Sequence, residues 1–366
     1  MTARPPFRAE QVGSLLRPPV LKAAHGRLRR GEIDQAGYDA VLQAAIADAV
    51  RMQEAAGLQS ISDGEFGRSS WFGFFFERMS GFELEPSAFR FKDGSGETFE
   101  WPTCHACETI RRHRPICVDE YRRLRSLTAR TPKVTMPSPS AFHFFRLDAP
   151  ADPAAYPDVE RYWDDLVAVY RAEVGDLIAA GCSYIQFDEV PLAMLCDPSI
   201  REQVQGLGGD PEALAGRYVD AIARILAGFE GQATFGMHLC RGNFRSRWMA
   251  AGGYEPVAER LFNGAPVDVF FLEYDTERAG GFEPLRFLPA GRHAVLGLVS
   301  TKTPELEPAA ELRRRIDAAA KLAPLDRLSL SPQCGFASVA GGNSIGPEAE
   351  AAKLKLVADV AAEVWH

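Results

Sequence analysis

Two kinds of segment alternate along the chain. Short runs rich in β-branched and aromatic residues predict buried strands, and longer stretches with apolar residues three or four positions apart predict helices. We expect strands at residues 58–63, 133–137, 184–188, 233–239, 269–274, 294–299 and 328–331, with a weaker one at 9–13. We expect helices at residues 38–56, 159–180, 211–229, 308–322 and 346–364.

This alternation predicts an α/β fold with a parallel sheet, because a helix between two strands lets them run in the same direction. Eight strands in a chain of this length favour a single (β/α)8 TIM barrel over an open doubly wound sheet. The first strand is also not followed by the G-x-G-x-x-G motif of dinucleotide-binding folds. We therefore expect residues 1–366 to form one barrel domain.

One connection is far longer than a single helix requires. Residues 64–131 separate the second and third strands, and the stretch FKDGSGETF at residues 91–99 predicts a β-hairpin around a Gly-rich turn. Long insertions after barrel strands usually surround the mouth of the active site. We expect this insertion to help cover the pocket.

The composition is that of an ordinary globular protein, with 46% hydrophobic and 25% charged residues. A formal net charge of −8 and a pI of about 5.5 give no electrostatic footprint for nucleic acid. No apolar run reaches the length of a membrane span, and the first residues lack the apolar core of a signal peptide. We therefore expect a cytoplasmic protein without nucleic-acid or membrane partners, whose seven cysteines need not form disulfides.

Four residues with metal-binding side chains fall at the ends of predicted strands. His238 and Cys240 end the fifth strand, Glu273 ends the sixth, and Cys334 follows the eighth. Side chains along a strand alternate with a period of two, so His238 and Cys240 point to the same side. Zinc takes imidazole, thiolate and carboxylate ligands in tetrahedral geometry. The set predicts a zinc site; the alternative is a barrel rim with two buried cysteines and an unrelated histidine.

The motifs around these residues resemble those of the catalytic half of cobalamin-independent methionine synthase and its single-barrel relatives. That family carries a His-x-Cys at one strand end, a Glu in an apolar strand and a late Pro-x-Cys-Gly. The matching residues here are His238-Leu239-Cys240, Phe271-Leu272-Glu273 and Pro332-Gln333-Cys334-Gly335. Upstream matches are Val12-Gly13-Ser14, Asp63-Gly64-Glu65 and Gln186-Phe187-Asp188-Glu189.

The resemblance implies a TIM barrel that binds one zinc ion per chain and transfers a methyl group to the thiol of homocysteine or a related molecule. It implies that Asp188 and Glu65 hold the amino group of the substrate and that Ser14 lies near its carboxylate. We place Glu189 in the same substrate-binding group. Independently, two carboxylates at the ends of the second and fourth strands would form a pocket for an ammonium group.

The expected chemistry depends mainly on the metal. A free thiol has a pKa of about 8.5 and is only slightly ionised at neutral pH, whereas zinc coordination removes its proton. Two thiolates and a carboxylate give the zinc site a formal charge of 2 − 3 = −1, which keeps the bound substrate sulfur nucleophilic. A weakly held Glu273 could yield its position to that sulfur, and attack on an electrophilic carbon then needs mainly positioning.

The chain departs from the family pattern in two ways. Full-length cobalamin-independent methionine synthases have a second, N-terminal barrel that contributes to folate binding. They also carry a histidine after the seventh strand that is thought to protonate the departing folate nitrogen. Lys302 stands in its place here. We expect Lys302 to be catalytic, although a lysine is a poorer general acid at neutral pH unless it is desolvated.

Lys302 leaves the donor open. A methyl-corrinoid would need no general acid, whereas Lys302 could instead bind a carboxylate or a sulfonate, or polarise an epoxide oxygen. The last role would make the chain a zinc-dependent epoxide:thiol transferase of the same superfamily. A third alternative is a non-catalytic zinc-binding barrel, which predicts a closed coordination sphere with no pocket beside the metal.

Two further features are open at this level. Cys104-His105-Ala106-Cys107, with His113 and Cys117 nearby, resembles a small zinc knuckle, but a C-x-x-C without a properly spaced partner pair is a weak signal. Trp71 opens an aromatic run that we expect mainly to pack in the core, with one or two rings lining the pocket or a surface for self-association into a homo-oligomer.

Overall fold

Six parallel strands form one continuous sheet in the order β10-β9-β8-β7-β6-β5. The computed structural model describes residues 4–92, 98–147, 149–243 and 245–365. Apart from one intermediate residue at the start of β7 and one at the start of β9, every residue of these strands is buried. The six are β5 (Val134–Pro137), β6 (Tyr184–Glu189), β7 (Thr234–Leu239), β8 (Val269–Glu273), β9 (His293–Val299) and β10 (Leu328–Pro332).

Two further chain segments extend this sheet toward a ring. β4 (Thr131–Pro132) leads into β5 and pairs in parallel with β1 (Ser60–Ile61). On the opposite side of the sheet, Ala9 forms a parallel bridge with Leu330 of β10. These are the eight strand positions of a (β/α)8 barrel, so the expected fold class is confirmed. In the described part of the chain, the continuous hydrogen-bonded ladder covers only six of them.

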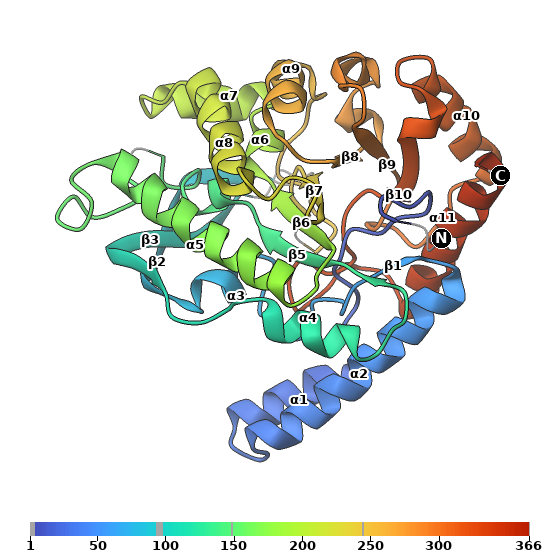
Figure 1. Ribbon diagram of the computed structural model, residues 1–366, viewed down its shortest axis with the longest axis horizontal. Helices are drawn as coiled ribbons and strands as arrows, with labels where there is room; N and C mark the ends of the chain where they lie inside the picture. The colour runs from blue at the N-terminus through green and yellow to red at the C-terminus, as the bar shows by residue number, and fades with distance from the viewer. Residues whose placement is uncertain (1–3, 93–97, 148, 244, 366) are drawn as a thin grey trace.

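Helices follow most of the strands and cover the outside of the sheet (Figure 1). α2 shows how their ends are specified: the Asp34 carboxylate accepts a hydrogen bond from Gly37 N at 2.8 Å, and Gly57 ends the helix with a φ of 101°. The large covering helices are α2 (Gln35–Ala56), α5 (Val159–Ala179), α8 (Pro211–Leu226), α9 (Glu255–Gly264), α10 (Ala309–Ala320) and α11 (Pro347–Val364).

The remaining helices are short or lie outside the barrel repeat. α1 and the first turns of α2 project from the body of the molecule as a helical hairpin (Figure 1). No described helix is both long and apolar enough to cross a membrane. The remaining helices are α1 (Pro19–Arg29), α3 (Gly73–Phe76), α4 (Val118–Arg125), α6 (Pro191–Met194), α7 (Pro198–Gly206), η1 (Pro139–Phe142), η2 (Glu277–Ala279), η3 (Glu283–Phe287) and η4 (Leu325–Arg327).

A buried polar chain runs through the interior toward the carboxyl ends of the strands. Lys133 Nζ lies 2.9 Å from Gln186 Oε1 and 3.8 Å from Glu10 Oε2. Gln186 in turn donates a hydrogen bond of 2.7 Å to Asp188 Oδ1. Burial lowers the pKa of Lys133 to about 8. This row of polar contacts therefore holds the Asp188 side chain, at the carboxyl end of β6, in a fixed orientation.

The insertion between β1 and β4 contains the expected hairpin. β2 (Met79–Lys92) and β3 (Thr98–Arg112) pair in antiparallel, and the central turn at 93–97 lies outside the described residues. Ala88 N donates to Phe145 O at 2.7 Å, so the hairpin packs on the segment that follows β5. Within β3, Cys104 is fully buried and Cys107 is partly exposed. Their odd spacing on a strand places them on opposite faces, which argues against a zinc knuckle.

Candidate functional site

Three of the predicted ligands meet at the carboxyl ends of the strands. Candidate ligand atoms of His238, Cys240 and Cys334 all lie within 4.8 Å of one another, and all three residues are buried. His238 and Cys240 come from the end of β7, where Cys240 N donates to Glu189 O at 3.1 Å. Cys334 follows β10, and its sulfur lies 3.4 Å from that of Cys240. We call these three residues the His/Cys/Cys cluster.

The surroundings of the His/Cys/Cys cluster suit a bound cation. Neither ring nitrogen of His238 has a hydrogen-bond partner among the residues that the structure describes. The neighbouring Cys334 thiol and burial together raise the pKa of Cys240 well above its usual value. A buried imidazole whose ring nitrogens have no hydrogen-bond partner lies beside two buried sulfur atoms, and a cation could use all three side chains as ligands. The three side chains could therefore hold a metal ion.

Glu273 lies outside the His/Cys/Cys cluster. Its carboxylate accepts hydrogen bonds from Arg241 N at 3.0 Å and from Lys302 Nζ at 3.3 Å, and it is paired with Arg278. Burial would raise the pKa of Glu273, but Lys302, Arg278 and Arg241 hold it well below its usual range. Glu273 is thus a buried carboxylate anion with cationic partners, and its role as a fourth metal ligand stays a prediction.

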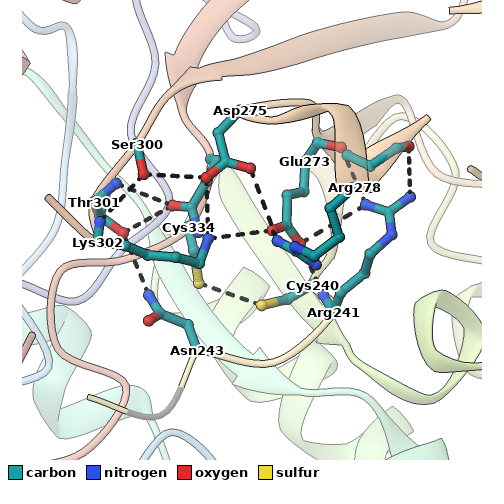
Figure 2. Close-up of polar contacts among 12 residues, drawn as sticks. Cys240, Arg241, Asn243, Glu273, Asp275, Arg278, Ser300, Thr301, Lys302 and Cys334 are labelled. Carbon is teal, nitrogen blue, oxygen red and sulfur yellow. Dashed lines mark hydrogen bonds and ion pairs between the residues drawn. The ribbon is translucent and has the colours of Figure 1, made fainter. Parts of the chain in front are cut away.

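Lys302 does not line the pocket beside the cluster. Its ammonium lies 3.3 Å from Glu273 Oε1 and 3.1 Å from Asp275 Oδ2 (Figure 2). Burial lowers the pKa of Lys302, but the two carboxylates outweigh burial and raise it above its usual value. Lys302, which we expected to be catalytic, therefore has two carboxylates of the protein itself as partners.

A pocket opens beside the His/Cys/Cys cluster and contains the two carboxylates expected to bind an amino group. Glu65 is buried and accepts a hydrogen bond of 2.9 Å from Thr135 Oγ1. Asp188 is adjacent to His238 across the β6–β7 pair. Burial and the nearby Glu65 raise the pKa of Asp188. Residues around the pocket are Val12, Ser14, Glu65, Trp71, Phe145, Asp188, Val190, His238, Cys240, Gly242, Asn243, Met249, Cys334, Gly335 and Ser338.

Ser14 lines this pocket as expected, and its position explains the glycine of the Pro-x-Cys-Gly motif. Phe336 N donates to Ser14 O at 2.8 Å, which fixes the N-terminal segment against the loop after β10. A Cβ atom on Gly335 would lie 2.0 Å from Ser14 Oγ. Only a glycine therefore lets this loop pass Ser14 while Cys334 faces the pocket.

Glu189 is the one expected substrate-binding residue that the structure places elsewhere. It is fully buried, accepts hydrogen bonds from Ser140 Oγ at 2.7 and 2.8 Å, and accepts another from Leu192 N at 2.9 Å. Because neighbouring residues on a strand point to opposite faces, Asp188 points into the pocket and Glu189 points away from it. Its expected place in the substrate-binding group is therefore corrected to a structural one at the start of α6.

The two arginines that contact Glu273 were not among the residues singled out in the sequence. Arg241 directly follows Cys240, is fully buried, and has its guanidinium carbon 4.0 Å from the ring centre of Tyr254. Arg278 belongs to η2, in the loop that follows β8. A signal for Arg241 was its place directly after the His-x-Cys motif. The sequence offered no comparable signal for Arg278, because its contact depends on the fold of a loop.

Comparisons with known proteins identify a family that matches nearly the whole chain. Residues 7–363 match the family described as "Cobalamin-independent synthase, Catalytic domain". The protein YxjH of Bacillus subtilis is 38% identical over 99% of this chain and 95% of its own length. A solved structure described as a putative vitamin-B12 independent methionine synthase from Listeria monocytogenes is 30% identical, with a TM-score of 0.79 and full coverage of both chains.

A more distant relative is named for its activity. The 5-methyltetrahydropteroyltriglutamate–homocysteine methyltransferase of Mycolicibacterium paratuberculosis is 26% identical over 98% of this chain, which spans only 43% of that protein. The family match covers nearly the whole chain, and the Bacillus protein is similar over almost its full length. Both findings assign the chain to a family. The chain belongs to the family of the cobalamin-independent methionine synthase catalytic domain, which is a family of methyltransferases.

Proposed function

We propose that the chain is a zinc-dependent methyltransferase whose acceptor is a small thiol, homocysteine or a close relative. The observation that carries this proposal is the His/Cys/Cys cluster in a pocket that also contains two buried carboxylates. One imidazole and two thiols form a ligand set that suits zinc. We also propose that residues 1–366 form one catalytic barrel domain that binds one zinc ion.

The residues around the pocket have different proposed roles in binding and positioning the substrates. When bound, zinc would supply the positive charge that keeps a substrate thiol deprotonated at neutral pH. Glu65 and Asp188 would bind the ammonium group of the substrate through charge-assisted hydrogen bonds, with Ser14 near its carboxylate. Trp71 and Phe145 line the same pocket with apolar surface, which favours exclusion of water and close positioning of the methyl donor.

For the donor, we propose a methyl group on a good leaving group, such as a methyl-corrinoid, in preference to methyl-folate. The support comes from Lys302, whose ammonium is paired with Glu273 and Asp275 and has a raised pKa. A lysine in that state is a poor proton donor to a departing folate nitrogen at neutral pH. A leaving group that needs no proton avoids this requirement.

Neither alternative has an observation in its favour. The epoxide:thiol transferase needs Lys302 to reach a substrate oxygen, but its ammonium lies on two carboxylates of the protein. The non-catalytic zinc barrel needs a closed coordination sphere, but His238, Cys240 and Cys334 all border a pocket. We therefore retain the methyltransferase.

A donor screen tests this function. The zinc-loaded protein is incubated with homocysteine and, in separate reactions, with methylcobalamin, methyl-folate or a small epoxide, and the products are measured by mass spectrometry. We expect methionine from methylcobalamin and much less from methyl-folate. A thioether formed only from the epoxide would establish the transferase alternative, and no alkylated thiol from any donor would contradict the proposal.

A further inference from the structure

A cluster of buried charges lies next to the two cysteines and centres on Glu273 (Figure 2). Glu273 and Asp275 have no exposed side-chain surface, and Lys302 and Arg278 have only 10% and 12%. Arg241 completes the group and is also fully buried. In such a setting each carboxylate needs a cationic partner, because an unpaired buried charge is strongly destabilising.

Both oxygens of Glu273 are occupied. Oε1 accepts hydrogen bonds from Arg278 and from Lys302 Nζ, the latter at 3.3 Å. Oε2 accepts one from Arg241 N at 3.0 Å and lies 3.7 Å from Arg241 Nη1. A cation that approached Glu273 would therefore compete with these donors for the lone pairs of the carboxylate, most of all at Oε1, which accepts two hydrogen bonds.

The three cations differ in how they are anchored. Arg241 also donates to the carbonyl oxygens of Gly252, Glu273 and Ala279 at 2.7, 3.1 and 3.2 Å. Arg278 also donates to Ala250 O at 2.7 Å, and its guanidinium carbon lies 5.2 Å from the ring centre of Trp248. Both arginines are thus fixed by contacts other than Glu273.

Lys302 is held differently, because its ammonium hydrogen-bonds to two carboxylates and, among the described residues, to no backbone carbonyl. Its nitrogen lies 3.1 Å from Asp275 Oδ2 and 3.3 Å from Glu273 Oε1. Asp275 Oδ2 also accepts a hydrogen bond of 3.1 Å from Ser300 Oγ, which keeps it in place. If Glu273 turned away, Lys302 would keep Asp275 as its partner and would not be left without a counter-charge, while Arg241 and Arg278 would keep their hydrogen bonds to backbone carbonyls.

We propose that Lys302 is a positioning residue that competes with the bound cation for the Glu273 carboxylate and so sets how tightly the site holds that cation. This rests on the proposed function, because it presupposes a metal on the His/Cys/Cys cluster. The ammonium draws the carboxylate toward Asp275 and lowers the affinity of the whole site for the cation. Lys302 therefore acts on the metal site through Glu273 rather than on the methyl donor.

Zinc affinity provides the test, measured by competition with a chromophoric chelator and without any turnover. Lys302→Met should bind zinc about tenfold or more tightly than the parent, because one charge-assisted hydrogen bond no longer opposes coordination by Glu273. Lys302→Arg should restore parent-like affinity. Asp275→Asn, which leaves Lys302 with Glu273 alone, should shift the affinity in the opposite direction.

A double-mutant cycle separates this route from a simple loss of positive charge. In a Glu273→Gln background, Lys302→Met should change zinc affinity by less than about threefold if Lys302 acts through Glu273. Lys321→Met, at the exposed C-terminal end of α10, controls for net charge and should leave the affinity unchanged. The proposal is overturned if Lys302→Met binds zinc equally or more weakly, or if its full effect persists in the Glu273→Gln background.

Failure of the proposed function would look different. In that case the parent protein would bind no zinc stoichiometrically, and both proposals would fall together. A parent that binds one zinc with the same affinity as Lys302→Met would retain the proposed function and reject only the role of Lys302. Circular dichroism of each variant checks that it is folded, and if Lys302→Met does not fold, Asp275→Asn alone decides by its direction.

Discussion

The sulfur atoms of Cys240 and Cys334 lie 3.4 Å apart, although 94 residues separate them in the sequence. β7 and β10 bring them together from two different parts of the sheet. Burial and the Cys334 thiol raise the pKa of Cys240 well above its usual value, and a cation held by the two sulfur atoms and His238 would favour the thiolate form of Cys240.

Replacing either of these cysteines should abolish stoichiometric metal binding. Cys240→Ser and Cys334→Ser each remove one soft ligand, and we expect zinc content to fall from about one per chain to well below half after dialysis. Inductively coupled plasma mass spectrometry of the purified variants measures this. Cys182→Ser, which removes another buried thiol away from the cluster, is the matched control and should keep its zinc. Equal zinc content in all three variants would exclude the cluster as the binding site.

The carboxylate of Asp188 should select substrates that carry an amino group. We expect Asp188→Asn to raise the KM for homocysteine by roughly tenfold to a hundredfold with a smaller effect on kcat, because a charge-assisted hydrogen bond to ammonium is lost. The KM for 4-mercaptobutyrate, which has no amino group, should change little. Equal losses on both thiols would mean that Asp188 has a general structural role.

Gly335 should tolerate no side chain while Ser14 is present. The Cβ of Gly335→Ala would meet Ser14 Oγ at 2.0 Å, and we expect a loss of about 1–3 kcal/mol of folding stability from overpacking. Adding Ser14→Ala should recover part of the loss, because the closest atom is then gone. Gly206→Ala in α7, where a Cβ meets nothing within 4 Å, serves as the control in urea denaturation. A parent-like Gly335→Ala would contradict the close approach.

Glu350 in α11 should make the protein less stable at alkaline pH. It is buried, accepts a hydrogen bond of 2.8 Å from Leu16 N, and has its pKa raised by burial to about 8. A folded-state pKa above the ordinary value of 4.5 means that its contribution is fully present below about pH 4.5 and is lost as the pH rises through about 8.

The Glu350→Gln variant isolates this effect. It should match the parent near pH 4 and become more stable than the parent by roughly 1.4 kcal/mol per pH unit across that window. Urea denaturation at pH 4, 6 and 8 measures the difference, with the exposed Glu348→Gln of the same helix as a control. A difference that does not vary with pH would show that Glu350 does not titrate in this range.

The hydrophobic pattern of the sequence predicted the strands at the candidate site better than the helices and loops around it. The apolar runs before His238 and Glu273 are long enough to specify buried strands, and both strands end within one residue of the expected positions. The hairpin of the insertion was also predicted from its Gly-rich turn and is confirmed by the pairing of β2 with β3.

Two helices, α1 and α9, were not predicted from the sequence, and their burial and length explain why. α1 buries only Leu21 and Ala24, so it has hardly any apolar stripe, and it projects from the barrel. α9 is short, at 10 residues, although Val257, Ala258, Leu261 and Phe262 form its buried face. That spacing was a usable signal for α9.

The sequence predicted that His238, Cys240 and Cys334 lie close together, and it did not predict the charge network around Glu273. His238 and Cys240 share a strand, so their common direction follows from the two-residue period. The contacts of Glu273 with Arg278 and Lys302 join the end of β8 to the loops after β8 and β9, and no local pattern specifies how such loops meet. Glu189 was placed wrongly for a simpler reason, because it was grouped with Asp188 although neighbouring strand residues face opposite ways.

X-ray absorption at the zinc edge tests the central claim most directly, because it counts the sulfur ligands before and after a thiol is added. The zinc-loaded protein should show two sulfur neighbours at about 2.3 Å, from Cys240 and Cys334, and three when homocysteine is present. Cys334→Ser should show one fewer in each state. An unchanged sulfur count on adding homocysteine, or zinc without any sulfur neighbour, would contradict the account.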